Sequence, residues 1–488
     1  MTFFGAQSDE TPRSRNWVHP AILVLGAVIA FAAHFRPWEV GFLEEWPLAA
    51  DWNRYGGGAF TASYFEWTLS RPLHLLPSLL GLVVGNGSPS GIFAILALVA
   101  SAQFLVVVWA LRPVSRSFWI SVALACFFSL HPLWPGGFLQ RFLPAQTAAL
   151  AFAVTMGLLI RWLATGRIRW IVLAAVVILM GYLVYPGPTA AAPLMALAVA
   201  VAVDSTWKRR IWAVGAIVGA SALMTLYSLV ISRLIIPGGK SYEIGNIEVA
   251  GVRSIRELVS HVSSTLLTQG DLVLLAVAGV AVLGGVLALT GAVPHKMGWL
   301  ITATAVASPL TTVVYFGHIG WLSDMARLSY VMSVGLFAAL CVWAIASTTR
   351  RVPLQNIVVV LLIVASLVGA VRGIQQWQPY IEVQHRLLEK LGPVVHEADG
   401  DDVVVVIDRS ATLGLEPTFP LQYLASASRV WNHDDTLVWL CYPEGVAVPG
   451  GGVLCDPEDT GDDLRLITSV PQGTGTIDIY IGRQDTND

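Results

Sequence analysis

The sequence predicts a polytopic α-helical membrane protein, with about eleven transmembrane helices and a small extracytoplasmic α/β domain at its C-terminal end. Hydrophobic residues make up 55% of the 488 residues, charged residues only 12%, and mean hydropathy is +0.66, whereas a soluble domain needs a more charged surface. Apolar stretches of membrane-spanning length recur along the chain, and the composition turns polar after about residue 372. The net charge of −3 gives no indication of a nucleic acid partner, so membrane lipids and lipid-linked molecules are the expected partners.

The first apolar run, 17–35, follows the polar residues 1–16, in which Arg13 and Arg15 stand just before it. The run is long for a signal peptide, lacks a convincing cleavage site and is followed by further membrane segments. We therefore expect an uncleaved helix with a cytoplasmic N-terminus.

Ten further apolar segments have lengths near the roughly 20 residues that cross a bilayer as a helix. They run over 92–111, 117–134, 142–162, 170–186, 188–203, 211–232, 272–292, 297–316, 329–347 and 354–372. Lysine and arginine accumulate in cytoplasmic loops, and here they fall in alternate short connections. These residues are Arg112, Arg116, Arg161, Arg167, Arg169, Lys208, Arg209, Arg210, Lys296, Arg350 and Arg351.

This alternation leaves no room for a full crossing by the short piece 73–85, which Pro77 interrupts. We predict that 36–91 forms one long external loop, whose helical parts 59–69 and 73–85 lie along or dip into the membrane. The same count places 131–141, 185–188, 233–271, 316–328 and the tail outside. The alternative is a twelfth, short helix and a cytoplasmic C-terminus.

The tail, 373–488, is expected to form the α/β domain. Val403–Asp408 is a mostly apolar run of strand length, and Thr476–Ile481 alternates as a half-buried strand does. Helical or loop pieces are expected at Ile381–Leu391 and Pro420–Ser428. Of the four cysteines, Cys126 and Cys341 fall in apolar stretches, whereas Cys441 and Cys455 would pair only in an oxidising compartment.

The most unusual stretch is an acidic, aromatic and basic island in the long first loop. It runs from Glu44 to Tyr55, continues through Gly56, Gly57 and Gly58, and is followed by Trp67 and by Ser70-Arg71-Pro72-Leu73. Charges in so apolar a chain point to function.

The layout and this island resemble the GT-C class of membrane glycosyltransferases, which use polyprenyl-phosphate-linked sugars. Within that class the chain looks most like the serotype-converting O-antigen glucosyltransferases, whose first loop carries Asp-Asp-Trp-x-Arg, then Gly, Trp and Gly-Arg-Pro-Leu. Here the first Asp is replaced by Ala50 and the Gly before Arg71 by Ser70. Two further positions are similar to the family: Tyr185, where the family often shows Tyr-Gln, and the run 226–230. The resemblance covers about 17–340 and implies a GT-C-like fold and sugar transfer.

An inverting transfer from a lipid phosphate needs a base beside the acceptor hydroxyl. Asp51 is the first candidate, Glu45 the second and Glu44 the third; the alternative is that all three are solvated loop charges. No cofactor is indicated, and no His or Cys spacing marks a metal site, although a divalent metal stays possible at the carboxylates.

The leaving phosphate needs cationic or hydrogen-bonding partners, and arginine matches phosphate oxygens bidentately. The expected substrate-binding residues are Arg71 and Arg327 first, then Arg54, His318, Tyr185 and Arg141. Arginines at a membrane interface and tyrosines of an aromatic belt are the structural alternatives.

Together these features predict a glycosyltransferase of the plasma (bacterial inner) membrane, with a cytoplasmic N-terminus. It would transfer a sugar from a polyprenyl-phosphate donor to an extracytoplasmic glycan or glycolipid acceptor. The alternatives are a transporter or flippase of a lipid-linked substrate, for which mid-helix charges and internal repeats are expected, and a catalytically silent membrane scaffold.

Overall fold

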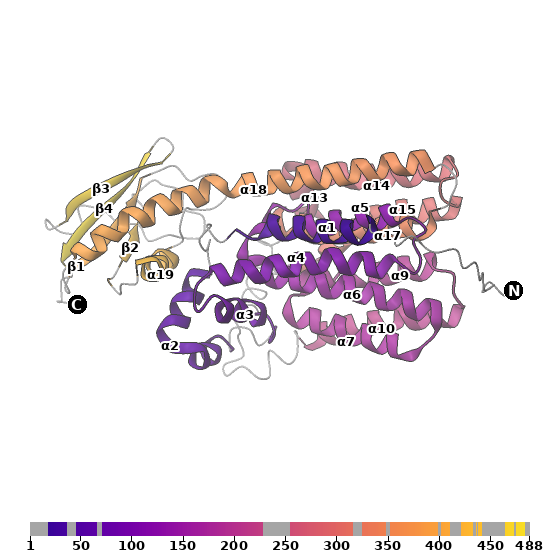
Figure 1. The fold of residues 1–488 in the computed structure, drawn as a ribbon, viewed down its shortest axis with the longest axis horizontal. Coiled ribbons are helices and arrows are strands. Elements are labelled where there is room, and N and C mark those ends of the chain that lie inside the picture. Colours follow the sequence, from indigo (N-terminus) through magenta and orange to yellow (C-terminus); the bar gives the residue numbers. More distant parts are fainter. Residues whose placement is uncertain are drawn as a thin grey trace.

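The computed structural model describes residues 18–36, 45–65, 71–227, 254–315, 325–347, 352–398, 402–409, 421–432, 436, 438–441, 464–472 and 475–483. Within these ranges the chain forms a long helical bundle with a four-stranded sheet beyond one end of it (Figure 1). We call the bundle end nearer the sheet the sheet end. The opposite end carries the connections 112–117, 165–168 and 203–207 and is called the basic end.

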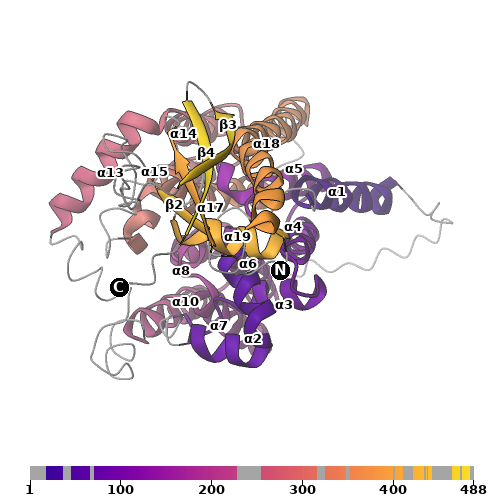
Figure 2. The ribbon, with the colours of Figure 1, turned by 90° about the vertical axis from the view of Figure 1, so that its left-hand side faces the viewer.

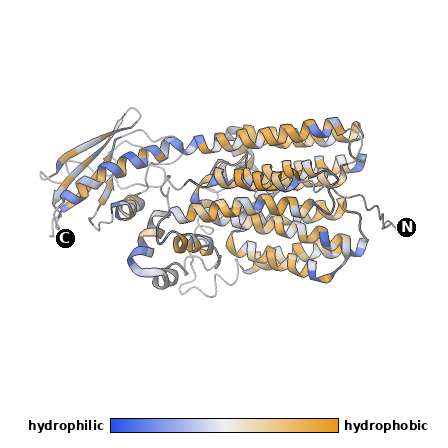
Figure 3. Cartoon of the chain, viewed as in Figure 1, coloured by the Kyte–Doolittle hydropathy of each residue, from blue (hydrophilic) through white to orange (hydrophobic). Residues whose placement is uncertain are grey.

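Six of the described helices are long and apolar enough to cross a membrane, so the chain is a helical membrane protein. They comprise α4 (Ser90–Leu111), α6 (Leu143–Thr165), α10 (Trp207–Leu226), α14 (Asp271–Leu289), α17 (Met325–Ala346) and α18 (Val352–Glu397). Shorter apolar helices are α1 (Val18–His34), α5 (Phe118–Leu130), α7 (Ile168–Val184) and α9 (Ala192–Ala202). The hydrophobic colouring in Figure 3 runs along the whole bundle.

The remaining helices are α8 (Pro186–Thr189), α13 (Ile255–Gln269), α15 (His295–Ala307) and α19 (Leu421–Asn432). Short 3-10 helices cover Pro135–Phe138, Gln140–Phe142 and Ser308–Tyr315. The predicted span 297–316 is therefore built as α15 followed by a 3-10 segment rather than as one α-helix. The centre of the bundle is α17, whose residues are almost all buried.

The predicted first loop contains two helices. Helix α2 (Glu45–Phe65) is broken at Gly56, where φ is 74° and ψ is 162°, a backbone conformation that favours glycine. Helix α3 (Leu76–Val84) has 9 residues and is too short to span a bilayer. It packs on α4, and the turn between them lies against α2, where the Asn53 amide donates to the Gly87 carbonyl at 3.5 Å.

Helix α18 continues without a break past the predicted end of its membrane segment. Its 46 residues include Pro379 and Pro393, which do not end it. The helical or loop piece predicted at Ile381–Leu391 is therefore part of α18. This helix is about 70 Å long at 1.5 Å per residue. The first part is exposed and apolar, and the last part buries one face against the sheet.

The sheet is formed by β1 (Asp402–Asp408), β2 (Val438–Cys441), β3 (Arg465–Gln472) and β4 (Gly475–Arg483), in the order β2-β1-β4-β3. β1 is parallel to β2 and antiparallel to β4, and β3 pairs antiparallel with β4. Both predicted strands are present, as β1 and β4. One face packs on α18 and α19. In Figure 2, α19 lies between the sheet and α2.

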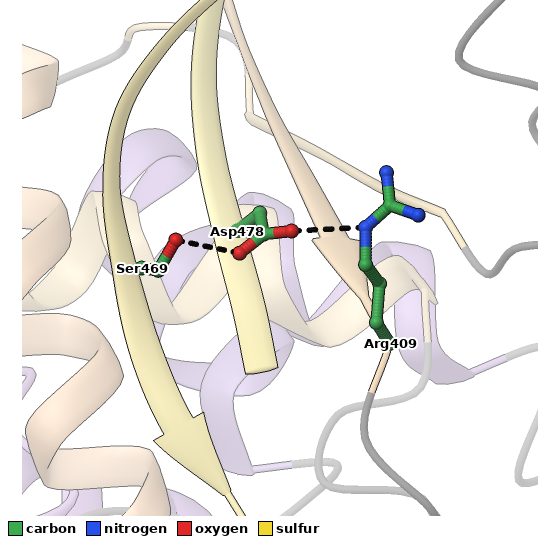
Figure 4. A network of polar contacts seen from close by, with 3 residues as sticks. All are labelled: Arg409, Ser469 and Asp478. Atoms are coloured by element: carbon green, nitrogen blue, oxygen red, sulfur yellow. Dashed lines mark hydrogen bonds and ion pairs between the residues drawn. The ribbon is translucent and has the colours of Figure 1, made fainter. Parts of the chain in front are cut away.

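A polar network fixes the edge of this sheet where β1 ends (Figure 4). Asp478 on β4 is only 8% exposed. Its carboxylate accepts from the Arg409 guanidinium at 2.9 Å and from the Ser469 hydroxyl at 2.6 Å. The buried Asp478 carboxylate therefore has one cationic and one hydroxyl partner, and these bonds connect β4 to β3 and to the residue that follows β1.

Candidate functional site

Two predicted substrate-binding residues meet at the sheet end of the bundle. Tyr185 directly follows α7 and is 7% exposed, and Arg327 lies in the first turn of α17. The Arg327 guanidinium donates to the Tyr185 hydroxyl at 3.4 Å. This contact joins two segments that lie 142 residues apart in the sequence.

A third predicted residue reaches the same tyrosine from the first loop. The Arg71 guanidinium carbon lies 5.6 Å from the centre of the Tyr185 ring, within the range of a cation–π interaction. Two hydrogen bonds hold this segment against the end of α7. The Leu73 amide donates to the Leu183 carbonyl at 3.1 Å, and His74 Nδ1 lies 3.0 Å from the Val184 carbonyl oxygen. The turn 71–75 is thus attached to the helix that presents Tyr185.

His74 completes this group and was not predicted as a site residue. Its ring stacks on Tyr185 with a centroid distance of 6.1 Å and an interplanar angle of 30°. Burial, followed by the positive charge of Arg71 and, more weakly, that of Arg327, lowers the pKa of His74 to about 3. The imidazole is therefore neutral at physiological pH. Because the Val184 carbonyl can only accept, Nδ1 carries the proton and Nε2 is a hydrogen-bond acceptor.

We refer to Arg71, His74, Tyr185 and Arg327 as the cationic cluster. The positive charges of Arg71 and Arg327 both lower the pKa of His74, and both arginines contact Tyr185. The two positive charges therefore lie close to the same histidine and tyrosine. Arg71 and Arg327 are both partly exposed residues. In chemical terms, two guanidinium groups are suited to a phosphate or another small anion, because they offer charge-assisted and bidentate hydrogen bonds.

Two of the three candidate bases, Asp51 and Glu45, belong to α2. Asp51 is partly exposed on this helix, and Glu45 is its first residue. Glu44 falls outside the residues that the structure describes. The buried side of α2 carries Trp46, which is 1% exposed and belongs to the hydrophobic core of the sheet, α18 and α19.

The other predicted substrate-binding residues are Arg54, Arg141 and His318. Arg54 is exposed and lies over the ring of Tyr55 at 5.3 Å. Arg141 lies over the ring of Phe142 at 5.3 Å. His318 is among the residues that the structure does not describe.

No group of three or more His, Cys, Asp or Glu side chains within the described ranges is arranged to hold a metal ion. Cys341 is buried with its Sγ 3.4 Å from the Met156 sulfur, so this cysteine packs in the bundle as expected. Cys455 lies outside the described residues, and the pairing of Cys441 with it stays a prediction.

Comparison with known proteins gives no match for this chain, whether to a family model, to a curated protein or to a solved structure.

Proposed function

We propose that the protein is a membrane glycosyltransferase that moves a sugar from a polyprenyl-phosphate donor to an extracytoplasmic glycan or glycolipid. The observation that supports this best is the cationic cluster, in which Arg71 from the first loop and Arg327 from the start of α17 meet at Tyr185. These were the two residues favoured for the lipid phosphate on sequence alone.

In the proposed reaction the donor phosphate binds to Arg71 and Arg327. An acceptor hydroxyl attacks the anomeric carbon from the face opposite the phosphate, and the bond between that carbon and the phosphate oxygen breaks with its electron pair. Negative charge therefore grows on the phosphate, which the two guanidinium groups stabilise. The hydroxyl proton passes to a carboxylate on α2, for which Asp51 is the first candidate and Glu45 the second.

The arrangement of the chain supports a surface reaction of this kind. The turn 71–75 leads into α3, and the end of α3 meets α2 through the bond from Asn53 to Gly87. Asp51 is thus carried by a helix that contacts the turn after α3, and Arg71 and His74 belong to the turn before α3. The proposed topology has about eleven crossings, a cytoplasmic basic end and an extracytoplasmic sheet domain, because lysine and arginine collect in cytoplasmic loops.

The test measures transfer of labelled sugar from polyprenyl-phosphate donors to cell-envelope glycans in membranes that carry the wild type or a variant. We expect Asp51→Asn to abolish transfer, and Arg71→Gln or Arg327→Gln to lower it by about 10²-fold or more, as loss of a group that stabilises transition-state charge does. Lys208→Gln, which removes an exposed cation at the basic end, should transfer as the wild type does.

Each negative outcome has a distinct meaning. Full transfer by Asp51→Asn would exclude Asp51 as the base and direct attention to Glu45. Full transfer by both arginine variants would exclude the cationic cluster as the phosphate site. If the wild type moves lipid-linked sugar across the bilayer without transferring it, the protein is a flippase; no transfer and no movement would indicate a scaffold.

A further inference from the structure

A second candidate binding site lies at the basic end, away from the cationic cluster. It is a groove of about 500 Å³ bordered by α1, α4, the connection 112–117 and the start of α5. Its apolar lining includes Leu23, Val108 and Phe118, and its polar lining consists of His19, Arg112 and three serines at 115, 117 and 121. One side is fixed by His19, whose ring stacks on Phe118 at 4.2 Å.

The groove follows from how α1 packs on its neighbours. Midway along α1, Gly26 lies so close to the Phe104 ring of α4 that a Cβ atom there would overlap it. The Ser101 hydroxyl of α4 also donates to the Ala27 carbonyl at 2.9 Å. The two helices are thus in tight contact at this level. Toward the basic end Pro20 and Leu23 face Val108 across the groove instead.

Among the described elements that border the groove, the charged side chains have one sign. Within the described ranges, α1, α4 and α5 contain no acidic or basic side chain apart from histidine. The connection between α4 and α5 contributes Arg112 and Arg116, both exposed. The groove therefore favours an anion, for which Arg112 and the Ser117 hydroxyl supply hydrogen-bond donors, whereas the Ser115 hydroxyl already donates to the Ser117 carbonyl at 2.9 Å.

An apolar strip continues from the groove along the outer side of α1. Pro20 lines both the groove and an adjoining shallow hollow, which is otherwise formed by Ala21, Val24, Leu25 and Val28. Val24 is 64% exposed, Leu25 58% and Val28 55%. An anionic site joined to a strip of this kind matches an amphiphile, whereas a free phosphate would use only the polar lining.

We propose that this groove binds a glycerophospholipid with an anionic headgroup. The phosphate contacts Arg112 and the Ser117 hydroxyl, the glycerol region lies beside His19 and Phe118, and one acyl chain follows Val24 and Val28 along α1. Basic pockets between transmembrane helices are known to hold anionic headgroups in this way. The site is independent of sugar transfer, because it lies at the opposite end of the bundle.

The test is native mass spectrometry of the full-length protein in mild detergent, titrated separately with dioleoylphosphatidylglycerol, dioleoylphosphatidylcholine and glycerol 3-phosphate. We expect one retained phosphatidylglycerol per chain, weaker retention of phosphatidylcholine, and no retention of glycerol 3-phosphate. Arg112→Gln should weaken phosphatidylglycerol binding by about fivefold, the effect of one surface cation near an anionic lipid. Arg167→Gln is the matched control, since it removes an exposed arginine of the same end outside the groove.

A second variant tests the proposal by filling the groove with a larger side chain. Leu23→Trp places an indole in it without changing charge and should also reduce phosphatidylglycerol retention. Equal retention of the two lipids, or an unchanged titration for both Arg112→Gln and Leu23→Trp, would overturn the proposal. Retention of glycerol 3-phosphate with the same affinity as the lipid would assign the polar lining to a small soluble anion and would equally overturn it.

Discussion

The Arg327 guanidinium and the Tyr185 hydroxyl lie 3.4 Å apart, although 142 residues separate them in the chain. The same tyrosine ring lies under Arg71, and His74 stacks on it. Tyr185 therefore connects the first loop to the start of α17. If the arginines bind the donor phosphate, their spacing depends on this ring.

Tyr185→Phe removes the hydroxyl that Arg327 contacts and keeps the ring under Arg71. We expect transfer to fall about fivefold, the value of one hydrogen bond of about 1 kcal/mol. Tyr185→Ala removes the ring as well and should reduce transfer much further. Donor titrations with both variants measure this; equal activity of Tyr185→Phe and Tyr185→Ala would show that the ring does not position Arg71.

The neutral His74 predicts a dependence of stability on pH. Its pKa is about 3 in the folded protein and near 6.5 in the unfolded chain, so between pH 6.5 and pH 3 the unfolded chain takes up a proton and the folded protein does not. The contribution to stability is therefore complete above pH 6.5 and is lost as the pH falls from 6.5 toward 3. At pH 5 the loss reaches at most about 2 kcal/mol.

His74→Gln removes the titrating group and keeps an N–H that can donate to the Val184 carbonyl. The melting temperature of the wild type, followed by tryptophan fluorescence at pH 7.5 and 5.0, should drop more than that of His74→Gln. Parallel drops in the two proteins would contradict a depressed pKa at His74.

Trp46 attaches α2 to the sheet domain, because its side chain is 1% exposed in the core of α18, α19 and the sheet. Trp46→Ala should cost about 3–5 kcal/mol locally, as removal of a buried aromatic side chain does. Limited proteolysis should then cut α2 faster. Tyr55→Ala is the control, since Tyr55 on the same helix is 55% exposed; equal protection of α2 in Trp46→Ala and the wild type would exclude this docking role.

Asp478 is expected to stabilise the sheet through its bonds from Arg409 and Ser469. Asp478→Asn keeps the shape and removes the charge, so the amides of β4 should exchange their hydrogens faster by about 1–3 kcal/mol of opening free energy. Glu397→Gln breaks the exposed ion pair with Arg465 and should change exchange by less than about 1 kcal/mol. Similar effects of the two substitutions would contradict a special role for the buried network.

Much of the fold could be predicted because lipid requires long apolar segments, and the predicted segments correspond closely to α1, α4, α6, α10, α14 and α17. The continuation of α18 beyond its apolar segment could not be predicted from hydrophobicity. Pro379 usually signals a helix end, and the polar residues after it suggest a new domain. The helix continues because the last turns of α18 pack on the sheet, and these contacts join residues far apart in the sequence, which a local sequence pattern does not reveal.

The candidate site was predicted in part. Arg71, Tyr185 and Arg327 were selected for chemistry, and the structure brings them together. His74 was missed because a single histidine in an apolar stretch carries no spacing signal; its place three residues after Arg71, on the same turn, was the available indication. The burial of Trp46 could not be predicted either, because it depends on α19, a helix more than 370 residues away in the sequence.

The unbroken α18 has a mechanical consequence. A helix turns by about 100° per residue, so deleting one residue near the middle of α18 would swing the whole sheet around the axis of this helix and draw it about 1.5 Å toward the bilayer. Helix α19 packs on the sheet and also contacts α2, so rotation of the sheet would carry α19 away from α2. The register of α18 therefore sets the direction in which the sheet faces and whether α2, the helix that carries Asp51, keeps its contact with α19.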